Sequence, residues 1–299
     1  MNRIIVDTDI GDDVDDVLAL AFALRCPHLD IKAITTVTAW TDKRAAIVKH
    51  LLKLSGKMDI PVGSGIELPM RGLSDEELAW MTAEKRLNHY AAVPVEERER
   101  EEERMSAAEL MIRTVERYPG DISIAAIGPL SNIALALRIR PSIASKIRSI
   151  ALMGGEVQIH RQEHNIAWDP EAAEVVLTSG IPLFLGTWSV TRQFILSLED
   201  CRIIENSNAE LGAFLGDCMK RWWPSKGSKP GPVMYDLAPL VWCFDRSFFE
   251  TSPMHIRVET SGALTRGMTL ASDRTPNAEV TTGMRAEALR LLFMQTICG

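Results

Sequence analysis

The sequence predicts a single α/β domain in which helices flank a mostly parallel central sheet. Short β-branched strands alternate with helical segments along most of the 299 residues, which is the pattern of strand–helix–strand units. Turns rich in carboxylates or glycines follow several of these strands, as at the ligand-binding edge of a parallel sheet. Because 46% of the residues are apolar, the chain can bury one large core. We therefore expect residues 1–299 to form one domain, with its site beyond the carboxyl ends of the strands.

The predicted strands are short runs rich in Ile and Val, which is typical of strands that are buried on both faces. They span residues 3–6, 31–37, 122–127, 147–153 and 182–185. Helical periodicity follows the first two strands, at residues 15–24 and 45–54. A helix between two strands gives the crossover that parallel pairing needs, so the pattern favours a parallel sheet.

A charged insert at about residues 72–104 interrupts this alternation. It ends in alternating Glu and Arg, where Glu96 and Arg100 stand one helical turn apart. We interpret the stretch as a solvent-exposed helix, with a lid or a subunit contact as the alternative. A second interruption, the Pro- and Gly-rich stretch 224–232, is predicted to be a loop.

Composition excludes several classes of function. A net charge of −7 leaves no basic face for phosphate groups, so we expect a small-molecule substrate and no nucleic-acid partner. The five cysteines are scattered and never spaced C-x-x-C, which indicates free thiols in a reducing compartment. We see neither a secretion signal nor an apolar run long enough to cross a membrane. A cytoplasmic protein without membrane contact is therefore expected.

The turn after the first strand concentrates negative charge. Six carboxylates lie within ten residues, and they are Asp7, Asp9, Asp12, Asp13, Asp15 and Asp16. Without a cation, their mutual repulsion would raise their pKa values and lower the stability of the fold. Oxygen ligands of this kind select Ca²⁺ or Mg²⁺ over softer metals. The turn therefore predicts a metal site.

A second polar segment follows the strand at 147–153. Glu163 and Asn165 supply an acceptor and a donor two residues apart, which could hold vicinal hydroxyl groups of a sugar. Asp169 precedes Pro170, a pair that predicts the start of a helix with Asp169 as its N-cap. Asp169 is therefore interpreted as structural.

Together these motifs resemble the inosine-uridine preferring nucleoside hydrolase family. They occur in the family's order between residue 4 and about residue 243, and as a set they are specific. The matching segments are Asp7-Thr8-Asp9-x-Gly11 with Asp15-Asp16, Ile127-Gly128-Pro129-Leu130-Ser131-Asn132, Met153-Gly154-Gly155, Glu163-x-Asn165 with Asp169-Pro170-Glu171-Ala172-Ala173, and Asp236.

The resemblance implies a Rossmann-like enzyme that hydrolyses the N-glycosidic bond of ribonucleosides with a bound Ca²⁺, and a homodimer or homotetramer. The implied metal ligands are Asp9, Asp16, Asp236 and the backbone carbonyl of Ile127. Asp9 is also the implied base for the attacking water. The implied ribose-binding residues are Asp15, Glu163 and Asn165, with Met153 beside the sugar.

The chain departs from the family pattern in the carboxylate-rich turn at residues 7–16, which we call the metal loop. The common motif is Asp-x-Asp-Pro-Gly-x-Asp-Asp, whereas two extra residues here separate Gly11 from the pair Asp15-Asp16. Alignment on the apolar helix that follows keeps this pair in the family's roles. Asp13 is the alternative metal ligand.

Other departures surround the leaving base. Tyr235 stands where many members have a histidine that protonates a purine, and a phenol with a pKa near 10 is a poorer proton donor. Trp40 replaces an expected asparagine, so it either packs or changes substrate preference, and the charged insert begins where a His-Gly-x-Asp-Gly loop is expected. Candidates for holding the base are Trp40, Trp222, Trp223 and Tyr235, with core packing or subunit contact as the alternative for the two neighbouring tryptophans.

Two other functions are compatible with parts of the sequence. Asp7-x-Asp9 after a strand also resembles the start of a haloacid-dehalogenase-type phosphatase, with Asp7 as nucleophile, but Gly11 stands where that family needs Thr or Val. The substitutions at Tyr235 and Trp40 allow a family member that binds a nucleoside or other riboside with altered specificity or little turnover. An EF-hand is excluded because the twelfth loop position is Leu18 rather than Glu.

Overall fold

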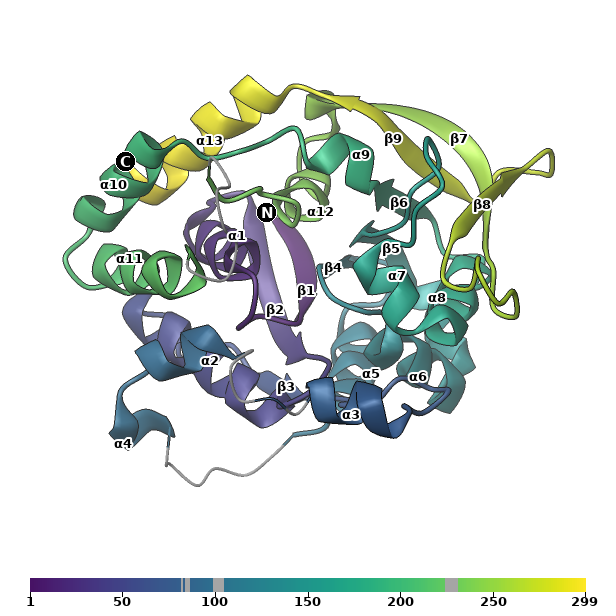
Figure 1. Cartoon of the computed structure of the whole chain (residues 1–299), viewed down its shortest axis with the longest axis horizontal. Helices are drawn as coiled ribbons and strands as arrows, with labels where there is room; N and C mark the ends of the chain where they lie inside the picture. The colour runs from purple at the N-terminus through teal and green to yellow at the C-terminus, as the bar shows by residue number, and fades with distance from the viewer. Residues whose placement is uncertain (82, 84–86, 99–104, 224–230) are drawn as a thin grey trace.

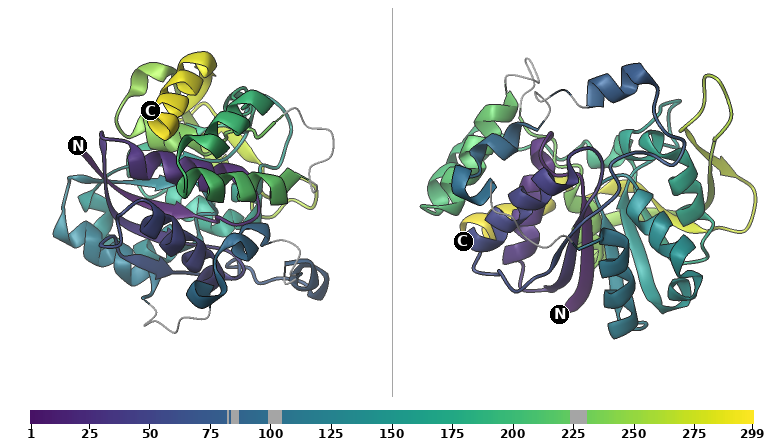
Figure 2. Two further views of the ribbon diagram at one scale, coloured as in Figure 1. Left: turned by 90° about the vertical axis from the view of Figure 1, so that its left-hand side faces the viewer. Right: turned by 90° about the horizontal axis from the view of Figure 1, so that it is seen from below.

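A computed structural model describes residues 1–81, 83, 87–98, 105–223 and 231–299, and confirms the predicted α/β domain. Its nine-stranded sheet has the order β3-β2-β1-β4-β5-β6-β9-β7-β8. All pairs from β3 to β9 are parallel, whereas β7 pairs antiparallel with both β9 and β8. Helices cover both faces of the sheet (Figures 1 and 2).

All five predicted strands are present, and four were missed. The strands are β1 (Asn2–Thr8), β2 (Leu29–Thr36), β3 (Val62–Ser64), β4 (Ile122–Ala126), β5 (Ile147–Met153), β6 (Leu183–Gly186), β7 (Phe249–Val258), β8 (Thr269–Ser272) and β9 (Ala278–Met284). The described 3₁₀ segments are η2 (Asn88–Ala92), η3 (Pro141–Lys146) and η5 (Arg246–Phe248). The missed strands are the three-residue β3 and the antiparallel group β7 to β9, which follows the last predicted crossover.

The two predicted helices correspond to α1 and α2. The described helices are α1 (Val14–Arg25), α2 (Thr41–Leu54), α3 (Asp75–Met81), α4 (Val95–Arg98), α5 (Ala107–Arg117), α6 (Ser131–Ile139), α7 (His164–Trp168), α8 (Pro170–Leu177), α9 (Trp188–Thr191), α10 (Leu198–Ser207), α11 (Leu211–Trp222), α12 (Leu237–Trp242) and α13 (Ala286–Cys298). None of these described helices is long and apolar enough to cross a bilayer.

Two apolar cores sit on the two faces of the sheet. One is built by α1, α2, α11 and α13, and the other by α5, α6 and α8. The strands between them are buried on both sides, which is why β1 and β4 read as nearly continuous apolar runs. In Figure 1, α10, α11 and α13 gather beside α1 at one end of the molecule, and the β7–β8 hairpin lies at the other end.

The strand order places the predicted site. The strand order reverses between β1 and β4. The chain adds β2 and β3 on one side of β1, and then adds β4, β5 and β6 on its other side. In open α/β sheets a crevice forms beyond the carboxyl ends of the strands at such a reversal. Asp9 and Ile127 follow these two strands directly, so both lie at this crevice.

The charged insert is less exposed than its sequence predicted. It contains α3, η2 and α4, and η2 packs against α2 and α11. Leu87, His89 and Val93 are buried, so three side chains of the insert join the core instead of facing water. The predicted pair of Glu96 with Arg100 and most of the predicted loop 224–232 lie outside the described residues.

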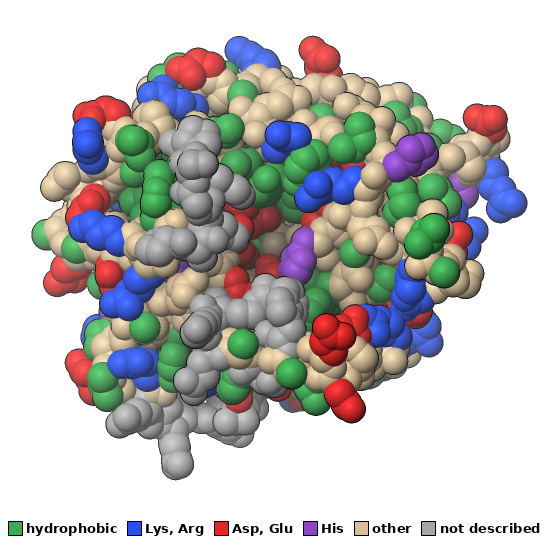
Figure 3. Space-filling view, in the orientation of Figure 1, with side chains coloured by type: hydrophobic (Ala, Val, Ile, Leu, Met, Phe, Trp, Pro, Cys, Tyr) green, Lys and Arg blue, Asp and Glu red, His purple; other side chains and the backbone are tan. Residues whose placement is uncertain are grey.

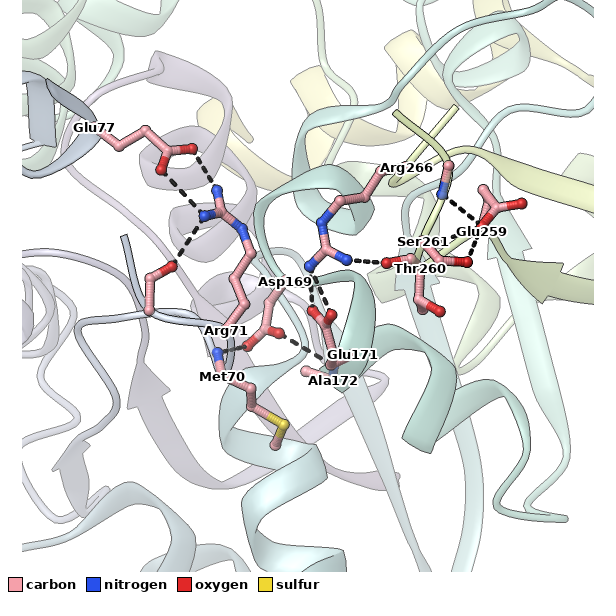
Figure 4. Close-up of polar contacts among 12 residues, drawn as sticks. Met70, Arg71, Glu77, Asp169, Glu171, Ala172, Glu259, Thr260, Ser261 and Arg266 are labelled. Carbon is pink, nitrogen blue, oxygen red and sulfur yellow. Dashed lines mark hydrogen bonds and ion pairs between the residues drawn. The ribbon is translucent and has the colours of Figure 1, made fainter. Parts of the chain in front are cut away.

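Asp169 is the N-cap of α8, as predicted, and it does more than cap. Its carboxylate accepts hydrogen bonds from the backbone N–H of Ala172 at 3.1 Å and of Met70 at 3.0 Å, and from the hydroxyl of Ser131 at 2.6 Å. These bonds join the segment after β3 to α6 and α8 (Figure 4). Glu171 on the same helix pairs with Arg266 from the segment between β7 and β8.

We expect Asp169→Ala to lower the free energy of unfolding by about 3 kcal/mol, because it leaves three donors in the interior without an acceptor. The control, Glu171→Ala, removes a partly exposed ion pair and is expected to cost about 1 kcal/mol or less. Urea unfolding followed by circular dichroism measures both values. Equal losses in the two variants would contradict the role assigned to Asp169.

Candidate active site

Carboxylates from distant parts of the sequence meet beyond β1. Asp15 and Asp16 lie in the first turn of α1 and Asp236 precedes α12, and one oxygen of each lies within 4.8 Å of the others. Asp9, on the turn after β1, is near enough for its charge to raise the pKa of both Asp16 and Asp236. We call these four residues the acidic cluster. Figure 3 shows a hollow in this face of the molecule with Asp or Glu side chains on its floor.

The acidic cluster carries more negative charge than its surroundings balance. Burial raises the pKa of every carboxyl group in it, because a carboxylate loses hydration away from water. The charges of Asp15 and Asp16 raise the pKa of Asp236 further, and Asp15 and Asp236 share a hydrogen bond that needs a proton between them. A divalent cation in place of that proton would leave all four ionised. Oxygen donors at this spacing fit Ca²⁺ or Mg²⁺.

The backbone after β4 approaches Asp9 closely. The N–H of Ile127 donates to the carbonyl of Asp7 at 2.8 Å. A Cβ at Gly128 would lie only 2.9 Å from the backbone nitrogen of Asp9 and 3.1 Å from its Oδ1. Glycine is therefore required here, and the Ile127–Gly128 peptide lies beside the acidic cluster.

Asp13, the alternative metal ligand, points elsewhere. It is the N-cap of α1, and its Oδ1 accepts the N–H of Val14 at 2.9 Å and the indole N–H of Trp222 at 2.6 Å. Among the described residues, the group of carboxylates that could hold a metal contains Asp15, Asp16 and Asp236 and does not contain Asp13. The resemblance assigns Asp15 to ribose binding, yet Asp15 belongs to the same group of possible metal ligands as Asp16.

The predicted sugar-binding residues also come together. Glu163 accepts hydrogen bonds from the backbone N–H groups of Gly155, Asn165 and Ile166 at 2.9–3.1 Å, and the amide of Asn165 donates to the carbonyl of Met153 at 3.1 Å. These bonds fix the loop between β5 and α7. Burial raises the pKa of Glu163, and the three backbone donors oppose that rise.

An exposed histidine connects the two halves of the site. The charge of His164 at the start of α7 lowers the pKa of both Glu163 and Asp9, so its side chain lies near both. The loop of Glu163 and the acidic cluster therefore lie on either side of His164.

The four aromatic candidates lie in different surroundings. Trp222 is buried in the core, and Trp223 lines a groove of about 290 Å³ between α10 and α11. Trp40 has a left-handed backbone, φ 65°, and its half-buried ring lies 3.9 Å from the ammonium of Lys43. Tyr235 is half-buried and receives a hydrogen bond from Trp188, and its pKa is raised by burial and then by the charge of Asp15. Tyr235 is the aromatic candidate that lies beside the acidic cluster.

Sequence reasoning missed the polar support beneath the site. Asp7 is fully buried, and its Oδ1 accepts the hydroxyl of Thr35 at 2.7 Å and the amide of Asn132 at 2.9 Å. Asn132 also donates to the carbonyl of Thr36 and accepts the N–H of Ile66. Burial raises the pKa of Asp7 to about 7. A phosphatase nucleophile has to be reachable by its substrate, so this position of Asp7 argues against that function.

Arg44 was also missed, and it holds the metal loop. Its guanidinium donates to the carbonyls of Asp9 and of Ile10, the latter at 2.8 Å, and pairs with Asp12 at 3.2 Å, while its Nε donates to Ala39 at 2.8 Å. The side chain is only 3% exposed, so these bonds are made out of water. A sequence signal was present, because an arginine at this position falls on the apolar face of α2.

His89 is a second missed residue beside the metal loop. Its backbone N–H donates to the carbonyl of Gly11 at 3.1 Å, and its ring is fully buried. Neither ring nitrogen has a hydrogen-bond partner in the described part of the chain, and burial lowers its pKa to about 4. The ring is therefore neutral at physiological pH, and it was missed because the insert was interpreted as a solvated surface.

Comparison with known proteins gives one answer from sequence and from structure. The inosine-uridine preferring nucleoside hydrolase profile matches residues 4–290. A probable uridine nucleosidase 1 of Oryza sativa subsp. japonica is 31% identical over 88% of this chain and 83% of its own length. The pyrimidine-specific ribonucleoside hydrolase RihA of Shigella boydii serotype 4 (strain Sb227) is 33% identical over 93% and 92%. A plant nucleoside hydrolase, the PpNRh1 enzyme, superposes with a TM-score of 0.87 at 26% identity over 100% of this chain and 99% of that one. The chain therefore belongs to the inosine-uridine preferring nucleoside hydrolase family, whose members hydrolyse the N-glycosidic bond of ribonucleosides.

Proposed function

We propose that this ribonucleoside hydrolase depends on Ca²⁺. The observation that carries the proposal is the acidic cluster, where buried carboxylates from the start of α1 and from the start of α12 lie within 4.8 Å of one another. The proposed ligands are Asp9, Asp16, Asp236 and the carbonyl of Ile127, with Asp15 shared between ion and sugar and Asp13 as the alternative. Oxygen-only donors on a flexible turn suit Ca²⁺ better than Mg²⁺, which demands stricter octahedral geometry.

The proposed reaction uses the charge of the site. Positive charge develops on the ribosyl ring as the bond to the base breaks, and the surrounding carboxylates stabilise that charge more in the transition state than in the ground state. Ca²⁺, when bound, would keep the carboxylates ionised and lower the pKa of a water molecule. Asp9 takes the proton of the attacking water, in one step with inversion at the anomeric carbon. Asp9 is less deeply buried than Asp15, Asp16 and Asp236, which suits this role.

The proposed ribose site lies between the acidic cluster and the loop of Glu163. Asp15, Glu163 and Asn165 are proposed to bind its hydroxyl groups, with Met153 against the sugar. Support comes from the hydrogen bonds that lock the loop of Glu163, since a rigid loop loses little entropy on binding. Tyr235 is proposed to face the leaving base, because it adjoins both Asp236 in sequence and Asp15 in space.

The compartment and the assembly are part of the proposal. All five cysteines are free, which supports a reducing compartment and so a cytoplasmic enzyme. A homodimer or homotetramer stays a prediction from the resemblance. The second candidate function is a riboside-binding protein with little turnover, which Tyr235 favours because a phenol is a weak proton donor.

Removal of the metal tests the proposal directly. We expect chelation to abolish ribose release from uridine, and added Ca²⁺ to restore it. Asp236→Asn should weaken Ca²⁺ binding in calorimetry by about tenfold or more, because the site loses one negative ligand. Asp217→Asn, which removes an exposed partner of Arg221 on α11, is the control and should bind like the wild type. Full activity of the chelated protein would refute calcium dependence.

The role of Asp9 as base has its own test. Asp9→Asn keeps the shape of the side chain but cannot take a proton, so kcat is expected to fall by about 10²–10⁴-fold. Asp217→Asn changes an exposed carboxylate on α11, away from the acidic cluster, and should keep kcat within a few-fold. Steady-state assays on uridine measure both. A rate for Asp9→Asn near that of the control would rule out the role.

Arg44 is expected to support both stability and ion binding. Arg44→Met leaves carbonyls of the metal loop without donors, so we expect a loss of about 3 kcal/mol in the free energy of unfolding and weaker Ca²⁺ binding. Arg44→Lys keeps the charge but not the planar fork, and intermediate values are expected. Urea unfolding and calorimetry provide the two readouts. Wild-type Ca²⁺ affinity in Arg44→Met would show that the arginine does not shape the site.

A further inference from the structure

Two arginines stack on one tryptophan near the proposed site. The guanidinium carbons of Arg161 and Arg192 lie 3.9 Å and 4.3 Å from the ring centroid of Trp188. All three come from segments after β5 and β6: Arg161 lies in the loop before α7, Trp188 begins the short helix α9, and Arg192 caps the end of that helix. We call these three residues the cationic rim.

The two guanidinium groups have no anionic partner in the part of the chain that the structure describes. Neither guanidinium group forms an ion pair or a hydrogen bond within the described residues, although the chain carries 40 acidic side chains. Most arginines around them in the sequence, such as Arg202 and Arg266, are paired with carboxylates. Both side chains are exposed, so their N–H donors are available to a ligand.

The cationic rim adjoins the proposed sugar site. The backbone N–H of Trp188 donates to the carbonyl of Gly155 at 3.0 Å, while the N–H of Gly155 donates to Glu163. On its other side Trp188 hydrogen-bonds Tyr235, and the charge of Arg192 acts on that phenol. Trp188 thus bridges the ribose side and the leaving-base side of the hollow, and Figure 3 shows Lys or Arg side chains beside that hollow.

We propose that Arg192, held against Trp188 and supported by Arg161, is a catalytic residue that stabilises the departing base as an anion. The inference rests on the proposed ribonucleoside hydrolysis and names the class of base that it favours. A fixed cation beside a departing group lowers the barrier as negative charge grows on that group. It does so without transferring a proton, so it suits a site whose aromatic neighbour, Tyr235, is a weak acid.

The step balances without a proton donor. The bond between the anomeric carbon and the base nitrogen breaks, and its electron pair stays on the base. Water forms the new bond to that carbon, and its proton goes to Asp9. The base anion spreads its charge onto ring carbonyl oxygens near Arg192 and takes a proton from solvent after release. Pyrimidine-2,4-dione ribosides fit this route, whereas purine ribosides that need protonation of the ring before departure fit it poorly.

A series of leaving groups tests the inference. Uridine and 5-fluorouridine have nearly the same shape but differ in the acidity of the base, and 4-nitrophenyl riboside has a leaving group that is stable as an anion. For Arg192→Gln we expect kcat/KM to fall about 30- to 100-fold on uridine, less on 5-fluorouridine, and less than about threefold on the nitrophenyl riboside. Arg192→Lys should recover most of the loss, because it keeps the charge. Arg161→Gln should show the same order of substrates with smaller losses.

The control is Arg113→Gln, on the exposed face of α5, which should leave all three rates unchanged. Equal losses on the three substrates, or no loss on uridine, would overturn the role of Arg192. If the wild-type protein released ribose from none of the three, the proposed function itself would fail and this inference with it. Normal turnover with no selective effect at Arg192 would overturn the inference alone.

Discussion

Negative charge gathered away from water is the constraint on which the rest of the structure depends. Four carboxyl groups of the acidic cluster are close together and poorly hydrated, and each is harder to ionise for that reason. The fold supplies compensation through Arg44 beneath the metal loop and, in our proposal, through a bound ion above it. Repulsion among these carboxylates lowers the stability of the fold, whereas the same negative charge stabilises a ribosyl cation in the proposed transition state. Stability and catalysis therefore favour different amounts of charge at these residues.

The sheet holds these carboxylates in fixed positions. Its strand order reverses between β1 and β4, which opens a crevice at their carboxyl ends, and the close approach of Gly128 to Asp9 brings two separate loops into contact there. Behind them, Asn132 and Thr35 hold Asp7 in place. The site is thus built on rigid strand ends, while the residues proposed to meet the base lie on short helices and loops.

The sequence predicted the parallel half of the sheet because its strands are continuous apolar runs, and it predicted the cap at Asp169 because Asp-Pro is a local signal. It did not reveal β7 to β9, where only two of the ten residues of β7 are buried and Pro253 interrupts the run. It also missed Arg44 and His89, whose importance lies in contacts with a loop more than thirty residues away. Local sequence patterns identify strands, helices and motifs. They do not reveal side chains such as Arg44 that reach a motif only in the folded chain.

The bonds of Arg44 have a consequence for how this metal loop can vary. The loop is two residues longer between Gly11 and Asp15 than the common family pattern, and Arg44 binds it on both sides of Gly11, through the carbonyls of Asp9 and Ile10 and the carboxylate of Asp12. Shortening the loop alone would remove the carboxylate that pairs with Arg44 in the interior, and replacing the arginine alone would leave the carbonyls of Asp9 and Ile10 without a donor. Loop length and residue 44 are therefore coupled, and a designer who changes one of them has to adjust the other.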